Sequence, residues 1–441
     1  MAQNPSETAR GAEAHVDDEL RTPEEKRKVA LTWVAVLGAI AIFSLRRPDV
    51  AYTILMFVIT LSVLVFVHEW GHYQFGRWGG MKINRFAIGF PPFIYTKRKN
   101  NIDYSIGALP IGGMVDIAGL GSEEEMVATT KGQASPIDAP NPRKPHGQKN
   151  FQDATLGWRF MTLFAGPLMN FIFALVVFAT LFSVVGVVDK YTRTTIVDVV
   201  QPYTPAFRAG LLSDDKILAI NGVRSDDPDK LRELIRKSNG QEITLLVQRG
   251  TQQLRLPLKP QFEEEEQLDG TKERVPIIGI MFLTTIDSYK RVGLFVGENG
   301  FSDSALGRGV FGSIGLADAI FGLLRRAVTG QLTENDKRSV GGPVKIAQSV
   351  GHSVKKSWQE WVLLAGTLSV NLGLMNLLPV PALDGGRILF LGFELLAGRP
   401  LDARKEGLVH MAGMVVLLAF MLFITVRDVL PLIQQGLEKV F

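Results

Sequence analysis

The chain has no cysteine among its 441 residues, and only six of those residues are histidine. The absence of cysteine excludes disulfide bonds and thiolate ligands, so any bound zinc must be held by imidazole and carboxylate groups. A large excess of one charge is also lacking, since 48 Lys and Arg stand against 44 Asp and Glu. We therefore expect no nucleic-acid partner and interpret the basic residues as flanks of membrane spans.

Apolar residues, by contrast, are abundant and occur in long blocks, with 46% of the chain hydrophobic. So much apolar sequence in uninterrupted stretches is typical of membrane proteins rather than of soluble enzymes. The polar residues 1–28 are predicted to form a disordered cytoplasmic tail. Five segments are predicted to be transmembrane helices: residues 29–45, 51–72, 160–188, 361–380 and 409–426.

A metal-binding motif lies at the end of the second predicted span, in the sequence His-Glu-Trp-Gly-His. On a helix, His68 and His72 are one turn apart on the same face, so both imidazoles can reach one Zn²⁺. Glu69 is placed to accept a proton from a metal-bound water. Ionisable groups in an apolar segment are costly, which makes these residues functional candidates. The alternative is a pair of helix-end histidines that reach the lipid headgroups.

Basic residues near the span ends predict the orientation of the chain. Residues 26–28, Lys-Arg-Lys, place the N-terminus in the cytoplasm, so the second span carries His72 toward the cytoplasmic face. The third span then exits, residues 189–360 lie outside, and the fourth span re-enters. The C-terminal end of the fourth span therefore returns to the side of His72, where a third metal ligand is expected.

Asp384 is the candidate for this third ligand. A catalytic zinc usually has three protein ligands and keeps its fourth position for water, and a carboxylate also supplies negative charge. Pro379 and Pro381 end the preceding helix, and residues 385–386, Gly-Gly, let the backbone pass close to other elements. The alternative is a helix-stop turn whose Asp binds nearby backbone amides. The histidine motif on the same predicted face favours a ligand, and hence one zinc ion per chain.

The histidine motif and the segment 376–386 together resemble the site-2 protease family of intramembrane zinc metalloproteases. Other stretches resemble this family in the expected order: residues 112–115, 165–171 and 341–344. The resemblance implies His68, His72 and Asp384 as zinc ligands and Glu69 as the general base. Asn376 is implied to bind substrate or to stabilise the oxyanion.

The family's membrane-associated β-loop is expected over residues 86–121, on either side of a basic turn at 97–101. Gly112 and Gly113 in this loop are implied to bind substrate. A transmembrane substrate hides its carbonyl groups in helical hydrogen bonds and must unwind, and a hairpin at the membrane edge could pair with the unwound segment as an added strand. The alternative is an ordinary cytoplasmic hairpin.

Residues 193–260 change in character and predict a β-rich domain. Short β-type runs occur at 195–200, 216–220, 242–248 and 253–258, with one amphipathic helix at 228–238. Segments 204–211 and 215–222 resemble PDZ domains, which implies a groove for an extended peptide or a C-terminal carboxylate. The alternative is a domain that only limits access to the membrane site. In residues 261–357 we expect a solvated acidic linker at 263–266 and an interfacial amphipathic helix at 310–328.

The predicted fold is a polytopic α-helical membrane protein with four core spans, an extra N-terminal span, an inserted β-rich PDZ-like domain and a membrane-associated β-hairpin loop. The halves of the core are residues 51–188 and 358–430, and a tail follows at 431–441. The resemblance implies a zinc metalloendopeptidase that cleaves transmembrane segments in regulated intramembrane proteolysis. Its implied location is the plasma (inner) membrane of a bacterium, with the metal site toward the cytoplasm and the PDZ-like domain outside.

The expected partners are transmembrane protein substrates, the lipid bilayer, and a peptide or C-terminal ligand at the PDZ-like domain. Two alternatives to a protease stay open. One is a catalytically silent receptor or scaffold with a structural zinc, although such zinc usually has four protein ligands and only three present themselves. The other is a transporter, which would be expected to show internal repeats, and none is found in the sequence.

Overall fold

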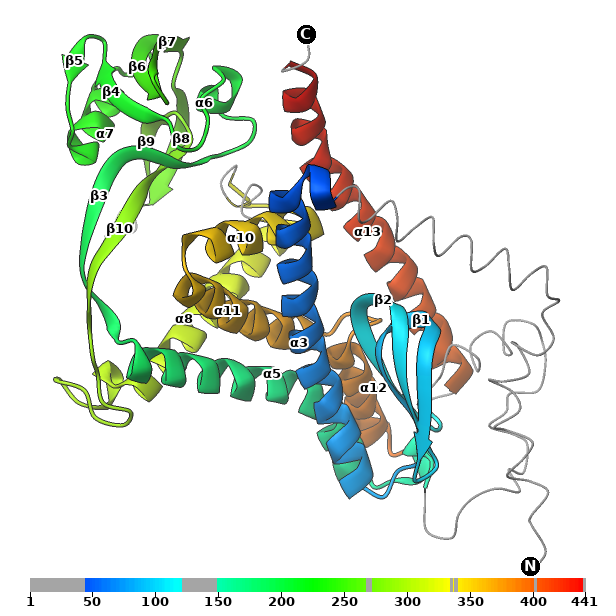
Figure 1. The fold of residues 1–441 in the computed structure, drawn as a ribbon. Coiled ribbons are helices and arrows are strands. Elements are labelled where there is room, and N and C mark those ends of the chain that lie inside the picture. Colours follow the sequence, from blue (N-terminus) through cyan, green and yellow to red (C-terminus); the bar gives the residue numbers. More distant parts are fainter. Residues whose placement is uncertain are drawn as a thin grey trace, which may run out of the picture.

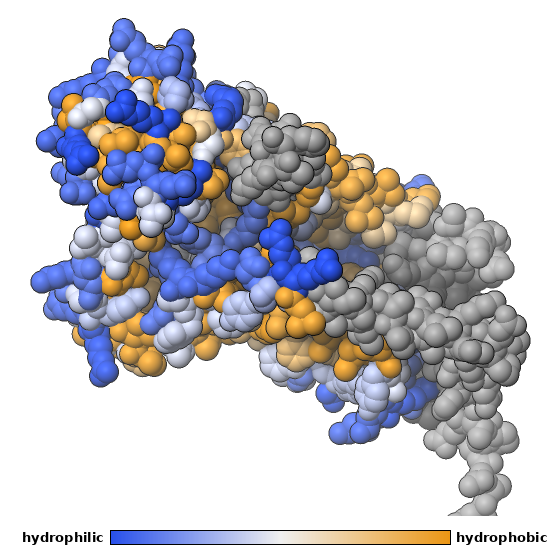
Figure 2. All heavy atoms as spheres, turned by 45° about the horizontal axis from the view of Figure 1, so that its top comes forward, coloured by the Kyte–Doolittle hydropathy of each residue, from blue (hydrophilic) through white to orange (hydrophobic). Residues whose placement is uncertain are grey.

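The computed structural model describes residues 44–120, 149–266, 272–333, 336, 340–399 and 403–438. The predicted tail at 1–28 and nearly all of the predicted span at 29–45 lie outside these residues. Helices form one part of the described structure, and a β-rich domain stands apart from them on a long two-stranded ribbon (Figure 1). Hydrophilic residues cover much of the β-rich domain, whereas hydrophobic residues gather over the helical part (Figure 2).

Four described helices are long and apolar enough to cross a membrane: α3 (Pro48–Trp78), α5 (Leu156–Val184), α8 (Ala305–Val328) and α13 (Ala403–Glu438). Helix α3 contains the span predicted at 51–72, and α13 contains the span predicted at 409–426. Helix α5 contains the span predicted at 160–188 except for its last four residues. The fourth differs from the sequence prediction, because α8 covers the segment expected to lie at the interface. The span predicted at 361–380 is not among these four described helices. Most of it lies in α11 (Trp358–Asn376), a helix whose Glu, Ser, Thr and Asn residues lower its apolar content.

Close packing joins α3, α5 and α11. A Cβ atom at Gly71 of α3 would lie 2.7 Å from the carbonyl carbon of Ala165 in α5, so glycine is what lets these two helices approach. The Trp361 indole N–H of α11 donates a hydrogen bond to the Thr60 hydroxyl of α3, at 2.9 Å. These contacts fix the face of α3 that carries Thr60, Leu64, His68 and His72, all of which are buried.

The predicted hairpin is present as β1 (Ile83–Lys99) and β2 (Ile102–Ile117), which pair antiparallel. Both strands fold back on themselves, because Arg85 pairs with Asp103 on one side and with Asp116 on the other. The result is a curled sheet beside the C-terminal half of α3 (Figure 1). Its core includes Phe86 and packs on Tyr73 of α3. The basic turn lies at one end of this sheet, while the bends at 89–93 and 107–112 lie at the other.

The β-rich domain is inserted between α5 and α8. Strands β3 (Val187–Val200) and β10 (Ile280–Lys290) pair over their whole length and form the ribbon that carries it. The sheet has the order β10-β3-β4-β6-β7, with β5 paired to β4. The remaining elements are α6 (Pro205–Arg208), β4 (Lys216–Ile220), β5 (Val223–Arg224), α7 (Pro228–Lys237), β6 (Ile243–Arg249) and β7 (Gln252–Leu258). The predicted strands and helix of 193–260 thus correspond to observed elements, but β10 extends the sheet beyond residue 260.

The acidic run at 263–266, expected to be a solvated linker, lies instead in β8 (Gln261–Glu266), paired with β9 (Lys272–Ile277). The cross-strand register contributes to this difference, since it places Glu264 opposite Arg274. The opposite charge of Arg274 favours the pairing of β8 with β9, which repulsion among the glutamates would disfavour.

Three further helices follow α8 and complete the described chain before α13: α10 (Pro343–Lys356), α11 and α12 (Asp384–Ala397). The turn at residues 377–383 reverses the chain between α11 and α12. An ion pair between Arg159 of α5 and Glu394 of α12, at 2.7 Å and largely buried, holds α12 against the N-terminal end of α5. The first residue of α12, Asp384, lies close to His68 of α3.

Candidate metal centre

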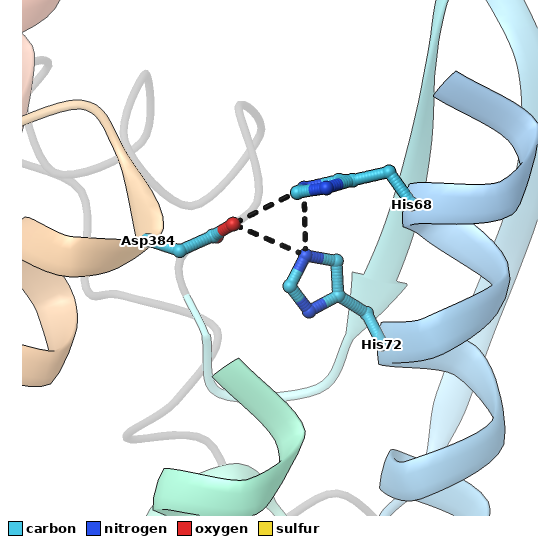
Figure 3. Close-up of side chains that lie close together, drawn as sticks. All are labelled: His68, His72 and Asp384. Atoms are coloured by element: carbon cyan, nitrogen blue, oxygen red, sulfur yellow. Dashed lines mark hydrogen bonds and ion pairs between the residues drawn. The ribbon is translucent and has the colours of Figure 1, made fainter. Parts of the chain in front are cut away.

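The two histidines of the motif lie on the buried face of α3. His68 is 7% exposed and His72 is 8% exposed. Their Nε2 atoms are 3.1 Å apart, so both imidazoles present the same nitrogen to one point (Figure 3). The spacing of one helical turn produces this arrangement directly, as the sequence predicts.

Asp384 reaches the same point from α12, more than three hundred residues later in the chain. Its Oδ2 lies 3.1 Å from His68 Nε2 and 3.4 Å from His72 Nε2 (Figure 3). The three residues offer one ligand atom each, and these atoms all lie within 4.8 Å of one another. The structure thus brings together the three residues that the sequence analysis selects.

The donor set fits a catalytic zinc ion. Two imidazole nitrogens and one carboxylate oxygen are preferred zinc ligands, and three of them leave a fourth position open. Asp384 Oδ2 is buried and has no conventional hydrogen-bond partner, an unfavourable state for a carboxylate that a cation would relieve. Within the described residues, this is the group of histidine and carboxylate side chains that could hold a metal ion.

The far side of each imidazole is held by α5. His72 Nδ1 lies 2.8 Å from the carbonyl oxygen of Thr162, so Nδ1–H donates there and the Nε2 lone pair faces the metal position. His68 Nδ1 lies 3.1 Å from the amide nitrogen Nδ2 of Asn170, a completely buried side chain whose Oδ1 has no hydrogen-bond partner. Turning the Asn170 amide over exchanges Oδ1 and Nδ2; Oδ1 then accepts the Nδ1–H of His68, the buried oxygen is satisfied, and His68 Nε2 is left free for a metal.

Gly166 of α5 forms the floor beneath the two rings. A Cβ atom there would overlap with Nε2 of His72 and would lie 2.5 Å from its Cε1 and 2.9 Å from Cε1 of His68. A side chain at this position would therefore occupy the space where the imidazoles converge.

The turn that carries Asp384 is held by α13. The backbone N–H of Ala382 donates to Nδ1 of His410 at 3.0 Å, and His410 is 7% exposed. Ala382 has φ +83°, in the left-handed region that residues with a Cβ rarely adopt, so this hydrogen bond supports a strained backbone. Gly413 brings α13 against Pro381 of the same turn, where a Cβ would lie 2.5 Å from the proline ring.

Glu69 lies beside the hairpin sheet as well as beside the histidines. Its carboxylate accepts a hydrogen bond from the main chain at Val115, and its Cγ is 3.1 Å from where a Cβ of Gly113 would lie. Gly112, one residue earlier, has φ +95° and forms the bend against the ring of Phe90. Gly113 therefore reaches the site, whereas Gly112 shapes the strand that enters it.

Asn376 is the last residue of α11 and is partly exposed. In the described part of the chain, no hydrogen bond or ion pair joins its side chain to the three candidate ligands. Its proposed role thus rests on its place at the start of the turn to Asp384.

Sequence reasoning missed Thr162, Asn170 and His410, which position the candidate ligands. A signal was present for two of them. Asn170 and His410 are polar residues inside predicted spans, and the cost of such groups in a membrane is the argument that selects His68. Thr162 acts through its backbone carbonyl, so its side chain carries no signal.

Comparison with known proteins gives a consistent result. The model of peptidase family M50 matches residues 56–420. A protein of Agrobacterium fabrum, whose name assigns it provisionally as a zinc metalloprotease, is 32% identical over 381 residues, covering 86% of this chain and 96% of that protein. A similarly named protein of Rhizobium meliloti is 33% identical over 388 residues, covering 88% and 98%. Zinc metalloprotease RasP of Oceanobacillus iheyensis is 28% identical over 440 residues, covering 86% and 98%.

Proposed function

Because the chain belongs to peptidase family M50, the site-2 protease family, and is a zinc metalloprotease, we propose that it hydrolyses peptide bonds within or beside the transmembrane segments of membrane proteins. The observation that carries this proposal is the position of the candidate ligands. His68 and His72 lie on a helix of 31 residues that is long and apolar enough to cross a membrane. His72 lies about 9 Å of helical rise before Trp78, where α3 ends. In a helix of this length, that position is inside the membrane-spanning part.

Zinc held by His68, His72 and Asp384 supplies Lewis-acid activation of water and of the scissile carbonyl group. Glu69 is the proposed general base, which accepts the proton at its carboxylate and later returns it to the leaving amine. The hydrogen bond from the main chain at Val115 orients this carboxylate. Asn376 is the proposed donor to the developing oxyanion, from its place at the end of α11.

We propose that substrate is held as an added strand at residues 113–117 of β2. This segment touches Glu69 through Gly113 and Val115, so a strand paired with it would pass the catalytic carboxylate. Within the described residues, β1 is the strand that pairs with β2, and no third strand covers this sheet. Backbone pairing also explains how a substrate helix is unwound, because it exchanges helical hydrogen bonds for ladder hydrogen bonds.

The β-rich domain is proposed to be PDZ-like and to bind an extended peptide or a C-terminus outside the cytoplasm. Two contacts support a fixed place for it. His352 of α10 lies 3.1 Å from Asp198 of β3, and the Tyr203 hydroxyl donates to the carbonyl of Arg427 in α13 at 3.1 Å. Figure 1 shows the domain toward the N-terminal end of α3, away from the end that follows His72. This separation agrees with a metal site toward the cytoplasm and a domain on the opposite side.

The proposal is tested with Glu69→Gln in the full chain. We expect cleavage of a transmembrane reporter to fall by about 10²- to 10⁴-fold, because the general base is lost, while the zinc content stays at one ion per chain. Zinc is measured by elemental analysis and cleavage by gel mobility of the reporter. Glu233→Gln, an exposed change of the same kind in the β-rich domain, is the matched control and should leave both unchanged. Equal cleavage by wild type and Glu69→Gln would remove Glu69 as the general base, whereas zinc binding without cleavage by the wild type would favour a scaffold with a structural zinc.

A further inference from the structure

A cavity of about 420 Å³ lies where the end of α3 meets the turn of the β1–β2 hairpin, outside the metal centre. It is lined by Arg77, Lys97, Lys99, Asn100 and Tyr104. Three of these side chains are cationic and none is acidic. The proposed hydrolysis uses none of them, so the concentration of positive charge calls for another explanation.

Asp103, an acidic residue of the hairpin, is engaged outside the cavity. Asp103 lies 3.8 Å from Arg98 and 4.0 Å from Arg85, neither of which lines the cavity. In the part of the chain that the structure describes, no carboxylate lies within ion-pair distance of the ammonium groups of Lys97 or Lys99. The cavity therefore keeps a net positive charge that an anion would neutralise.

The cavity is built from ordered elements rather than from a loose loop. Arg77 donates to the Tyr73 hydroxyl at 3.1 Å and its guanidinium lies 5.4 Å from the centre of the Tyr73 ring. The hydroxyl groups of Tyr73 and Tyr104 are 2.7 Å apart, which joins α3 to β2. Partial burial and this hydrogen bond raise the pKa of Tyr104 to about 12, so its hydroxyl stays neutral. Asn100 and Asn101 both have positive φ and form a tight turn.

The surroundings place this cavity at a membrane surface. Arg77 and Trp78 are the last two residues of a helix long enough to span a bilayer, and Trp78 is 59% exposed. Tyr95 and Ile94 of the hairpin are also largely exposed. Tryptophan and tyrosine at the end of a span are typical of the headgroup level, and basic residues there attract anionic lipids.

We propose that this cavity binds the phosphate group of an anionic phospholipid. A soluble phosphate compound offers the same charge, but it does not use the exposed apolar side chains at this end of α3 and in the hairpin, Trp78 and Ile94. A lipid bound here contacts both the helix of the metal site and the hairpin whose other end reaches Glu69, so it holds the two together. The site is separate from the candidate zinc ligands and from the strand edge at residues 113–117 that is proposed for substrate.

The test measures binding to the purified full chain in detergent, with the soluble lipid dioctanoyl phosphatidylglycerol as the probe. Dioctanoyl phosphatidylcholine and inorganic phosphate are the comparison ligands. We expect the phosphatidylglycerol to bind more tightly than either. The double variant Lys97→Gln/Lys99→Gln should weaken its binding about 25-fold, at about fivefold for each lysine.

Arg98→Gln is the matched control, because it removes one positive charge from the same turn but from a residue paired with Asp103 outside the cavity. It should change binding less than twofold. Equal binding of the two lipids, or equal losses in the control and the double variant, would overturn the proposal, since either result indicates only diffuse attraction. Binding of inorganic phosphate as tight as that of phosphatidylglycerol would assign the cavity to a soluble anion instead.

Discussion

Gly166→Ala is expected to disrupt the metal centre without damaging the helix that carries it. The new methyl group would overlap with His72 Nε2 and approach His72 Cε1 to 2.5 Å and His68 Cε1 to 2.9 Å. Carbon atoms normally pack at about 3.5 Å or more, so the rings must move by several tenths of an ångström to about 1 Å. A metal site tolerates displacements of only about 0.5 Å, and we expect zinc affinity to fall at least 100-fold.

The helix itself should not weaken from the change of residue type. Alanine favours a helix interior over glycine by about 1 kcal/mol, so any loss of stability must come from the overlap with the imidazoles. A Cβ atom at Gly157, in the first turn of the same helix, would have no heavy atom within 4 Å beyond its immediate chain surroundings, which makes Gly157→Ala a matched control. Zinc affinity is measured by competition with a chelator, and helix content by circular dichroism. Unchanged zinc affinity in Gly166→Ala would refute the packing argument for this site.

Three further changes test other parts of the structure. Asp384→Ala should lower zinc content well below one ion per chain by elemental analysis, and full occupancy would remove it as a ligand. His410→Ala should weaken zinc binding about 10- to 100-fold in the same chelator competition, because it frees the strained Ala382 turn; an unchanged affinity would contradict this positioning role. Arg249→Met should destabilise the β-rich domain by about 3 kcal/mol in urea unfolding, because the side chain of Asp215, which is 1% exposed, loses its bidentate partner. Arg232→Met is the control, because it removes one partner of an exposed ion pair and should cost under about 1 kcal/mol.

The histidine pair could be predicted from the sequence because its geometry is local. The helical period alone places His68 and His72 together, and the apolar segment around them marks them as functional. Asp384 required a second argument, from the orientation of the spans, that its turn returns to the same side. The structure brings it there, and the family match confirms a zinc metalloprotease.

The elements that differ from the sequence prediction depend on pairings between distant residues. β10 joins the sheet by pairing with β3 some ninety residues earlier, and β8 pairs with β9, which places Glu264 opposite Arg274. No local pattern in either segment shows its partner. Likewise, the fold-back of β1 on both sides of Arg85 follows from the register of the sheet, not from the period of the strand.

The positioning residues show that the site and the helical fold depend on each other. Thr162 and Asn170 of α5 hold the imidazoles of α3, while His410 of α13 holds the turn that begins α12. Each candidate ligand is therefore oriented by a helix other than its own. A zinc ion bound among them would link α3 to α12 directly and to α5 and α13 through these hydrogen bonds, because a metal that binds only the folded state stabilises it. The few polar groups in the apolar helices thus specify which faces meet, a choice that uniformly apolar surfaces would leave open.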